Sequence, residues 1–194
     1  MSEKIPCLQC GAEILPSTAT RTNGLCMPCK GGYRQSIEDS KRRILAEREA
    51  ERTDPFRKLW LSLVMRVHDP SGGFGFLAHT EKLYYAVRLL DGEVYNGGFH
   101  QYFFNSSSTH YAYAEEGLIV VGADRTLELL LDAKELVFPG IGVPEATGER
   151  RQALRSLPRP NDLRLAELDS QYYKDPDGLA DRIEAFAREH NLVS

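Results

Sequence analysis

Apolar residues recur every three or four positions from residue 55 to near the C-terminal end of the chain. This spacing places them on one face of a helix, whereas a half-buried strand requires alternation of apolar and polar positions. The first such segment follows Pro55, and its apolar positions are Phe56, Leu59, Trp60, Leu63, Val64 and Val67. Since no segment shows sustained alternation, we expect an all-α, multi-helix globular domain of about seven helices.

The ends of these helices are predicted from residues that cap helices or interrupt them. Thr80 is expected to cap the second helix, which the sequence predicts to end at Asp91-Gly92. Asp124 is expected to cap a later helix, and Asp175-Pro176-Asp177 is expected to start the last one with proline at its first position. After Thr109, helices are predicted at residues 110–121, 124–138, 148–157, 162–174 and 177–190.

The four cysteines of the chain all precede this region, at positions Cys7, Cys10, Cys26 and Cys29. Their spacing, C-x2-C-x15-C-x2-C, is typical of a tetrathiolate zinc site, because each C-x2-C turn brings two sulfurs to one metal ion. Four thiolates complete a tetrahedral coordination sphere, so we expect a structural Zn²⁺. A short β-hairpin is expected between the two pairs. Disulfides, and redox or iron–sulfur chemistry, are the alternatives for these residues.

Residues 31–53 follow the cysteines and predict a helix of a different kind, because charged residues dominate it. Its apolar positions are few (Ile37, Ile44 and Leu45), so we expect a mostly solvated helix. Asp54-Pro55 ends it, since the residue before a proline disfavours helical backbone. The predicted organisation is therefore a zinc-binding head (residues 1–33), a polar helical linker (34–54) and the all-α domain (55–194).

The composition is that of a globular protein, with 42% hydrophobic and 27% charged residues. The longest purely apolar run, residues 118–121, is far too short to cross a membrane. Residues 1–6 lack the apolar stretch of a secretory signal. We therefore expect a cytoplasmic protein without membrane contact.

Charge is distributed unevenly along the chain, whose net charge is −4. Residues 1–53 contain nine basic and seven acidic residues, and residues 54–194 contain 15 basic and 21 acidic residues. The run Lys41-Arg42-Arg43 could contact phosphate, although acidic residues of the same helix offset its charge. Direct nucleic-acid binding by the head is therefore an alternative to protein binding.

The segment from Glu93 to Ser108 is rich in glycine, aromatic and polar residues. Asn96-Gly97-Gly98 predicts a turn, after which Phe99, Tyr102 and Phe103 share the buried face of a short helix. Its polar members define a candidate pocket, made of Tyr95, Asn96, His100, Gln101 and Asn105. A catalytic interpretation makes His100 a general base that Gln101 or Asn105 orients. Because the sequence offers no nucleophile with a paired acid and no phosphate loop, we expect no enzyme and no catalytic residues.

Residues 95–107, YNGGFHQYFFNSS, closely resemble the hallmark of a bacterial family that was first described as a domain of unknown function. The family takes its present name from a DNA-mimic protein, and the resemblance covers residues 55–190. It implies an α-helical fold whose acidic surface imitates the phosphates of DNA and occupies the DNA-binding face of a transcription factor or nucleoid protein. The cysteine-containing segment similarly resembles the small treble-clef or zinc-ribbon heads of several bacterial proteins.

Acidic residues suited to such a surface lie in helical stripes. The candidates are Glu115, Glu116, Asp124, Glu128, Asp132 and Glu135, and a second stripe contains Asp177, Asp181 and Glu184. Residues four apart on a helix stand about 6 Å apart along its axis, close to the roughly 7 Å that two phosphates of one DNA strand cover. Basic residues are expected to interrupt the negative surface, and the largest cluster of them contains Arg150, Arg151, Arg155, Arg159 and Arg164.

We therefore expect a non-enzymatic binding or regulatory protein that acts through protein–protein contact, with DNA mimicry toward a DNA-binding protein as its specific form. One alternative is a zinc head that binds nucleic acid while the helical domain recruits a partner. Another is an immunity or small-ligand-binding protein that uses the pocket around His100. Homodimer formation stays open.

Overall fold

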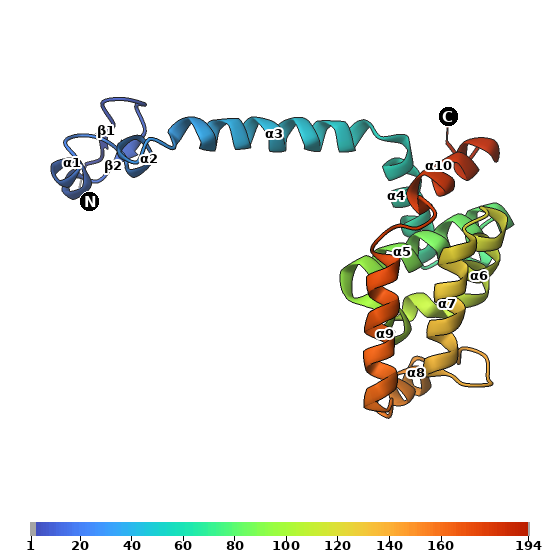
Figure 1. Cartoon of the computed structure of the whole chain (residues 1–194). Coiled ribbons are helices and arrows are strands. Elements are labelled where there is room, and N and C mark those ends of the chain that lie inside the picture. The colour runs from blue at the N-terminus through green and yellow to red at the C-terminus, as the bar shows by residue number, and fades with distance from the viewer. Residues whose placement is uncertain (1–2, 194) are drawn as a thin grey trace. The chain divides into compact units, whose positions relative to one another are not determined.

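The structure divides into two compact units, whose boundary in the sequence lies between Asp54 and Pro55. It is a computed structural model that describes residues 3–193. Figure 1 labels the helices and strands of both units. The two units differ in secondary structure and in what fills their interiors, and each is described by itself.

The N-terminal unit begins with a two-stranded antiparallel sheet. β1 (Ile5–Pro6) pairs with β2 (Glu13–Ile14), so the hairpin encloses the first cysteine pair. Two short helices follow, α1 (Pro16–Arg21) and α2 (Met27–Lys30), and α2 begins directly after Cys26. The hairpin expected between the two cysteine pairs is therefore wrong in its position. Pro16 explains this, because proline at the first position favours a helix in that interval.

The polar helix of this unit is α3 (Arg34–Thr53). It begins at Arg34 rather than at residue 31 because Gly32 adopts a left-handed backbone conformation, with φ 73°. Charged side chains one turn apart pair along it: Arg34 with Glu38, Lys41 with Glu38, Arg42 with Asp39, and Arg52 with Glu49. Pairs at this spacing favour an exposed helix, which agrees with the predicted solvated character.

All regular secondary structure among the described residues of the second unit is helical, which confirms the all-α class. Its α-helices are α4 (Pro55–His68), α5 (His79–Phe104), α6 (Tyr111–Val120), α7 (Asp124–Val137), α8 (Thr147–Arg155), α9 (Arg159–Tyr172) and α10 (Leu179–Glu189). Two 3-10 helices, η1 (Phe74–Phe76) and η2 (Ser106–His110), flank α5. Figure 1 shows α7 and α9 side by side, and α5 packs against α6, α8 and α9.

Helix α5 is longer than the sequence predicts, and it is kinked. The expected end at Asp91-Gly92 is wrong, because the helix continues through these residues. Non-helical backbone angles occur at Gly97, with φ −171°, and at Gly98, with φ 74°. Glycine adopts the left-handed region without the steric cost of a Cβ. The segment predicted as a turn therefore redirects one long helix instead of separating two.

Two of the predicted N-caps are displaced into the helices that they were expected to start. Helix α5 begins at His79, so Thr80 lies in its first turn. The Ala78 N–H donates to Glu81 Oε2 at 2.8 Å, which satisfies one of the free N–H groups at this helix start. Asp124 is the first residue of α7 rather than its cap. Acidic residues thus occupy the first turns, where the helix dipole favours them.

The start of α10 also differs from the prediction. The helix begins at Leu179, after Gly178, and not at Pro176. Asp175 still acts at this end, because its Oδ1 accepts a hydrogen bond from the Leu179 N–H at 2.8 Å. Asp175 is therefore a capping residue as predicted, but residues 176–178 form a turn before the helix.

Buried residues from both halves of α5 belong to the core of the helical unit, and the aromatic ones of its second half are examples. Phe99, Tyr102 and Phe103 are all 0% exposed, which confirms their predicted burial. Phe103 meets Phe138 edge to face, with ring centroids 5.2 Å apart. Phe99 meets Tyr172 of α9 in the same manner at 5.6 Å. The kinked helix therefore places its aromatic side chains between the helices that follow it.

Candidate metal centre and acidic face

Four cysteine side chains converge in the N-terminal unit. Cys7 follows β1, Cys10 lies in the turn of the hairpin, and Cys26 and Cys29 stand at the start of α2. Their sulfur atoms all lie within 4.8 Å of one another, and all four are free thiols. Cys10 is exposed and the other three are buried. The two distant pairs thus form one possible metal site, as their spacing predicts.

The sulfur geometry fits a tetrahedral metal ion. Four thiolates at the usual Zn–S length of about 2.3 Å would stand about 3.8 Å apart. The Cys10 and Cys26 sulfurs are 3.7 Å apart. A disulfide would require about 2.05 Å between the two sulfurs. These residues could therefore hold a metal ion such as zinc, which favours all-thiolate coordination.

Hydrogen bonds stabilise two of the cysteines as thiolates. The Cys26 N–H donates to Cys7 Sγ at 3.1 Å, and this bond is the main cause that lowers the pKa of Cys7 to about 6. Arg34 Nη2 donates to Cys26 Sγ at 3.0 Å, and this contact lowers the pKa of Cys26. Burial raises the pKa of Cys29 to about 12. A metal ion that bound all four sulfurs would therefore have to displace the Cys29 proton.

The basic run of α3 has partners on its own helix. Lys41 Nζ lies 3.3 Å from Glu38 Oε1, and Arg42 pairs with Asp39. Arg43 Nη2 donates to the Ser40 hydroxyl at 3.4 Å. The acidic residues thus offset two of the three positive charges, and this leaves little uncompensated charge for a phosphate backbone.

The glycine pair of the hallmark segment is explained by Asp169 on α9. The Phe99 N–H is left free by the kink, and it donates to Asp169 Oδ1 at 2.8 Å. A Cβ at Gly98 would lie 2.2 Å from Asp169 Oδ2. Burial raises the pKa of Asp169, and the hydrogen bond from Phe99 opposes that rise. This close approach requires glycine at position 98, so the motif has a structural role here.

Gln101 and Asn105, two of the candidate pocket residues, bind Glu93. Gln101 Nε2 and Asn105 Nδ2 donate to Glu93 Oε2 at 2.7 Å and 2.8 Å. The Ser107 hydroxyl donates to Glu93 Oε1 at 2.7 Å. These side chains therefore join the two arms of kinked α5 to η2, and the bonds direct Gln101 and Asn105 to Glu93 instead of His100.

The other three candidate pocket residues lie at the surface of α5. The Tyr95 ring lies 5.8 Å from the ring of Tyr173. His100 is exposed and stacks on Phe104, with ring centroids 6.0 Å apart. Asn96 is also exposed. The described contacts do not direct these five side chains toward one common space. The pocket expected from them therefore stays a prediction.

The acidic stripe of α7 is exposed along its whole length, at Asp124, Glu128, Asp132 and Glu135. Arg125 pairs with Glu128, and Lys134 Nζ lies 3.6 Å from Glu135 Oε2. Among the described residues, Asp124 and Asp132 form no ion pair. The stripe therefore carries two free carboxylates and two that neighbouring basic side chains partly neutralise.

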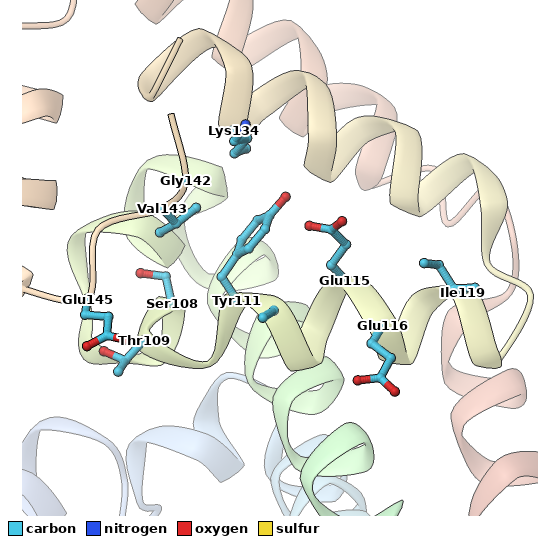
Figure 2. A pocket seen from close by; sticks show the side chains of 11 residues that line it. Ser108, Thr109, Tyr111, Glu115, Glu116, Ile119, Lys134, Gly142, Val143 and Glu145 are labelled. Atoms are coloured by element: carbon cyan, nitrogen blue, oxygen red, sulfur yellow. The ribbon is translucent and has the colours of Figure 1, made fainter. Parts of the chain in front are cut away.

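Glu115 and Glu116 belong to the preceding helix, α6, and line a surface pocket of about 510 Å³. Figure 2 shows this pocket between α6, Lys134 of α7 and the segment that contains Glu145. Glu116 Oε1 lies 2.9 Å from His79 Nε2. The two acidic candidates of α6 thus contribute to a hollow rather than to the stripe of α7.

Arg150 was expected at the surface within a basic cluster, and this expectation is wrong. Its side chain is 0% exposed. The guanidinium donates to the main-chain oxygens of Phe103, Asn105, Pro144 and Glu145 and to the hydroxyls of Thr109 and Thr147. These bonds satisfy carbonyls at the end of α5, which have no partner within the helix. This buried role could not be predicted from the sequence, because arginine side chains are usually exposed.

Arg151, the next residue of that cluster, is also held against the core. Its guanidinium lies 4.4 Å from the centre of the Phe104 ring, and its Nε donates to the Phe104 carbonyl at 3.1 Å. Arg155, Arg159 and Arg164 remain exposed. The basic cluster therefore interrupts the negative surface less than the sequence suggests.

These features define the class of the protein: an all-α domain with a hallmark glycine kink, preceded by a four-cysteine module. Comparison with known proteins is consistent with this assignment, because the model of the family described as "DMP19-like protein" matches residues 76–190. The match covers more than half of the chain, so the chain belongs to the DMP19-like family. This confirms the resemblance stated for the hallmark segment.

A curated relative adds no functional information. The protein described as "Uncharacterized protein YpfL" of Salmonella typhimurium is 44% identical over 75 residues, which are 36% of this chain and 18% of the relative. The chain thus covers less than a fifth of the length of that relative. No solved structure matches the chain. In the part of the chain that the structure describes, no helix combines the length and the apolar character that crossing a membrane requires.

Proposed function

We propose that the helical domain is a non-enzymatic regulatory module that binds the DNA-contacting face of a DNA-binding protein through carboxylates that take the place of DNA phosphates. Family membership supports this assignment. The observation that carries it is the α7 stripe, whose four exposed carboxylates follow one helix face from Asp124 to Glu135. Members of the stripe that are four residues apart are separated by about 6 Å along the helix axis, which is close to the roughly 7 Å that two phosphate steps of one strand span.

The charge of the surrounding surface also supports this function. Burial of Arg150 removes one positive charge from the exposed surface of the domain. Residues 54–194 contain 21 acidic and 15 basic residues, so the domain carries a net negative charge. Opposite charge on a partner's DNA-binding face would speed association and would make binding sensitive to salt.

The N-terminal unit is proposed to contribute a zinc-stabilised head on a polar helix. The four thiolates would complete the coordination of the ion, so no open position would remain for hydrolytic chemistry. The pairing of Lys41 and Arg42 with acidic residues of α3 makes this helix a weak candidate for phosphate binding. We therefore assign the head a structural or protein-docking role.

The test is an affinity pull-down of the full chain from a bacterial lysate, with retained protein and nucleic acid measured together. We expect a DNA-binding protein to be retained without DNA, to be released between about 50 and 200 mM salt, and to be displaced by added duplex DNA. Displacement by DNA is decisive, because imitation requires that the two compete for one face. Retention of nucleic acid alone would overturn the proposal and move the function to the head.

A variant pair assigns the effect to the α7 stripe. The double substitution Asp124→Asn and Asp132→Asn removes the two carboxylates that have no ion pair, and capture should fall by at least tenfold. The control, Asp162→Asn with Glu167→Gln on α9, removes the same charge from exposed positions outside the stripe. Equal loss in both variants would show a net-charge effect and contradict the assignment to α7.

A further inference from the structure

The pocket on α6 has a lining that differs from that of the exposed stripe. Its volume is about 510 Å³, and its lining residues include Glu115, Glu116 and Glu145. The Glu116 carboxylate is directed away from Glu115 and toward the other side of α6 (Figure 2). Ala112, Ile119 and Val143 contribute apolar surface. A site with negative charge and an apolar wall suits a ligand with a cationic end and an aliphatic stem.

The charge of the lining is not balanced internally. Lys134 is the one basic side chain among the lining residues, against three carboxylates. Its ammonium lies 3.6 Å from Glu135, whose carboxylate lies outside the pocket lining. His79 contacts Glu116 at 2.9 Å. Among the described residues, Glu115 and Glu145 form no ion pair, so an added cation would find two free carboxylates in this pocket.

Tyr111 provides a second, independent indication of a ligand. Tyr111 is only 9% exposed, and its hydroxyl makes no hydrogen bond with the residues that the structure describes. Figure 2 shows this hydroxyl directed into the space between Lys134 and Glu115. Burial, followed by the negative charge of Glu115, raises the pKa of Tyr111, so the phenol stays neutral. A buried hydroxyl without a partner costs free energy, and a ligand that hydrogen-bonds to it would remove that cost.

We propose that this pocket binds an arginine side chain presented by the protein partner. The guanidinium carries five N–H donors in a planar fork, so it can donate to the Glu115 carboxylate and to the Tyr111 oxygen at the same time. The apolar wall around Ile119 would contact the methylene groups of the same side chain. The inference rests on the proposed function, in which the partner presents a basic, DNA-contacting face.

The test uses a small probe in place of the partner. N-acetyl-L-arginine amide carries the guanidinium without a free carboxylate or amine, and N-acetyl-L-citrulline amide is its neutral isostere. Each is titrated into the full chain while backbone amide resonances are followed by NMR. We expect the arginine probe to shift resonances of α6 and of residues 142–145, and we expect the citrulline probe to leave them in place.

Two substitutions assign the binding to the pocket. Glu115→Gln removes a charge-assisted hydrogen bond, and the probe should bind about tenfold more weakly. Tyr111→Phe should weaken binding about threefold while the fold is kept, because the lost hydroxyl makes no hydrogen bond within the described part of the chain. Glu167→Gln, an equal charge change outside the pocket, should leave probe affinity unchanged. Absent shifts, equal binding of citrulline, or unchanged affinity in both pocket variants would overturn the inference.

The outcomes separate this inference from the proposed function. In one outcome, Glu115→Gln captures a DNA-binding protein as well as the original chain does, and the arginine probe causes no shifts. This outcome would contradict arginine binding by the pocket and leave the α7 stripe as the binding surface. Binding of the probe without capture of any DNA-binding protein would support the arginine site and contradict DNA mimicry.

Discussion

The two units of the chain hold their folds in different ways. In the N-terminal unit, the buried cluster of apolar residues consists of Cys7, Cys26 and Cys29, with Ile14 and Leu25 partly buried beside them. In the helical unit, every α-helix contributes at least one side chain to a single core. A segment of this size cannot bury enough apolar surface to fold alone. We therefore expect the first unit to depend on a bound metal ion for its stability, and the second unit to be stabilised by its apolar core.

The largest expected effect is therefore that of metal removal. On treatment of the full chain with a strong chelator, we expect the N-terminal unit to lose its fold, because metal–thiolate bonds take the place of an apolar core. The helical unit should keep its urea unfolding midpoint. The chain has one tryptophan, Trp60, which stacks on Tyr85 at 5.2 Å and reports on the helical unit. The dispersion of the backbone amide resonances of residues 5–30, measured by NMR, reports on the N-terminal unit.

The matching substitution is Cys29→Ser, which removes one buried ligand without a chelator. It should reproduce the loss of amide dispersion, whereas Ser36→Ala on the exposed α3 should not. The interpretation is contradicted if the purified, metal-free chain keeps dispersed resonances for residues 5–30. A mass lower by the hydrogens of two disulfides would then favour the disulfide alternative.

The contrast between the units also explains which features sequence could predict. The convergence of the four cysteines was predictable because they come in local pairs, whose C-x2-C spacing indicates a turn without knowledge of the tertiary fold. The helices of the second unit were identified because burial on one face leaves a period of three to four residues. Both signals are local. They place the helices after α5 to within a few residues, but they miss the continuation of α5 from Asp91 to Phe104.

Features that depend on distant residues were missed. Asn96-Gly97-Gly98 is compatible both with a turn and with a kink in a helix. The kink is stabilised by Asp169, which accepts a hydrogen bond from the Phe99 N–H although it lies 70 residues away in the sequence. The burial of Arg150 could not be predicted, because its hydrogen-bond acceptor, the Phe103 carbonyl, lies 47 residues away in the sequence. Long-range hydrogen bonds leave no periodic signal.

The second largest effect is expected from Arg150→Leu in the helical unit. The substitution removes the guanidinium hydrogen bonds to the carbonyls of Phe103, Asn105, Pro144 and Glu145. We expect the free energy of unfolding to fall by about 3–5 kcal/mol. Urea unfolding followed by Trp60 fluorescence measures this. Arg155→Leu, on the exposed face of the same helix, should change stability by less than about 0.5 kcal/mol. Similar losses in the two variants would show that the buried hydrogen bonds carry no special weight.

A smaller effect is expected from Gly98→Ala. Alanine at this position would have a Cβ in left-handed backbone, and that Cβ would clash with the Asp169 carboxylate. We expect the free energy of unfolding to fall by about 3 kcal/mol. Gly92→Ala is a matched control in the same helix, because a Cβ there meets no atom within 4 Å. The control should stabilise the domain by about 0.5–1 kcal/mol. Tolerance of alanine at position 98 would contradict the structural explanation of the hallmark glycine.

The smallest effect concerns the link between the metal site and the polar helix. Arg34 Nη2 contacts Cys26 Sγ at 3.0 Å, and Arg34 is also the first residue of α3. Groups that hydrogen-bond to metal ligands typically change metal affinity by about 10–100-fold. We expect Arg34→Gln to weaken metal affinity by about tenfold, measured by chelator competition, and to leave the Trp60 unfolding curve unchanged. Arg43→Gln, on the same helix but without a cysteine contact, is the control. If Arg34→Gln also lowered the stability of the helical unit, the two units would not be independent in solution. An unchanged metal affinity would show that Arg34 does not contribute to metal binding by the four thiolates.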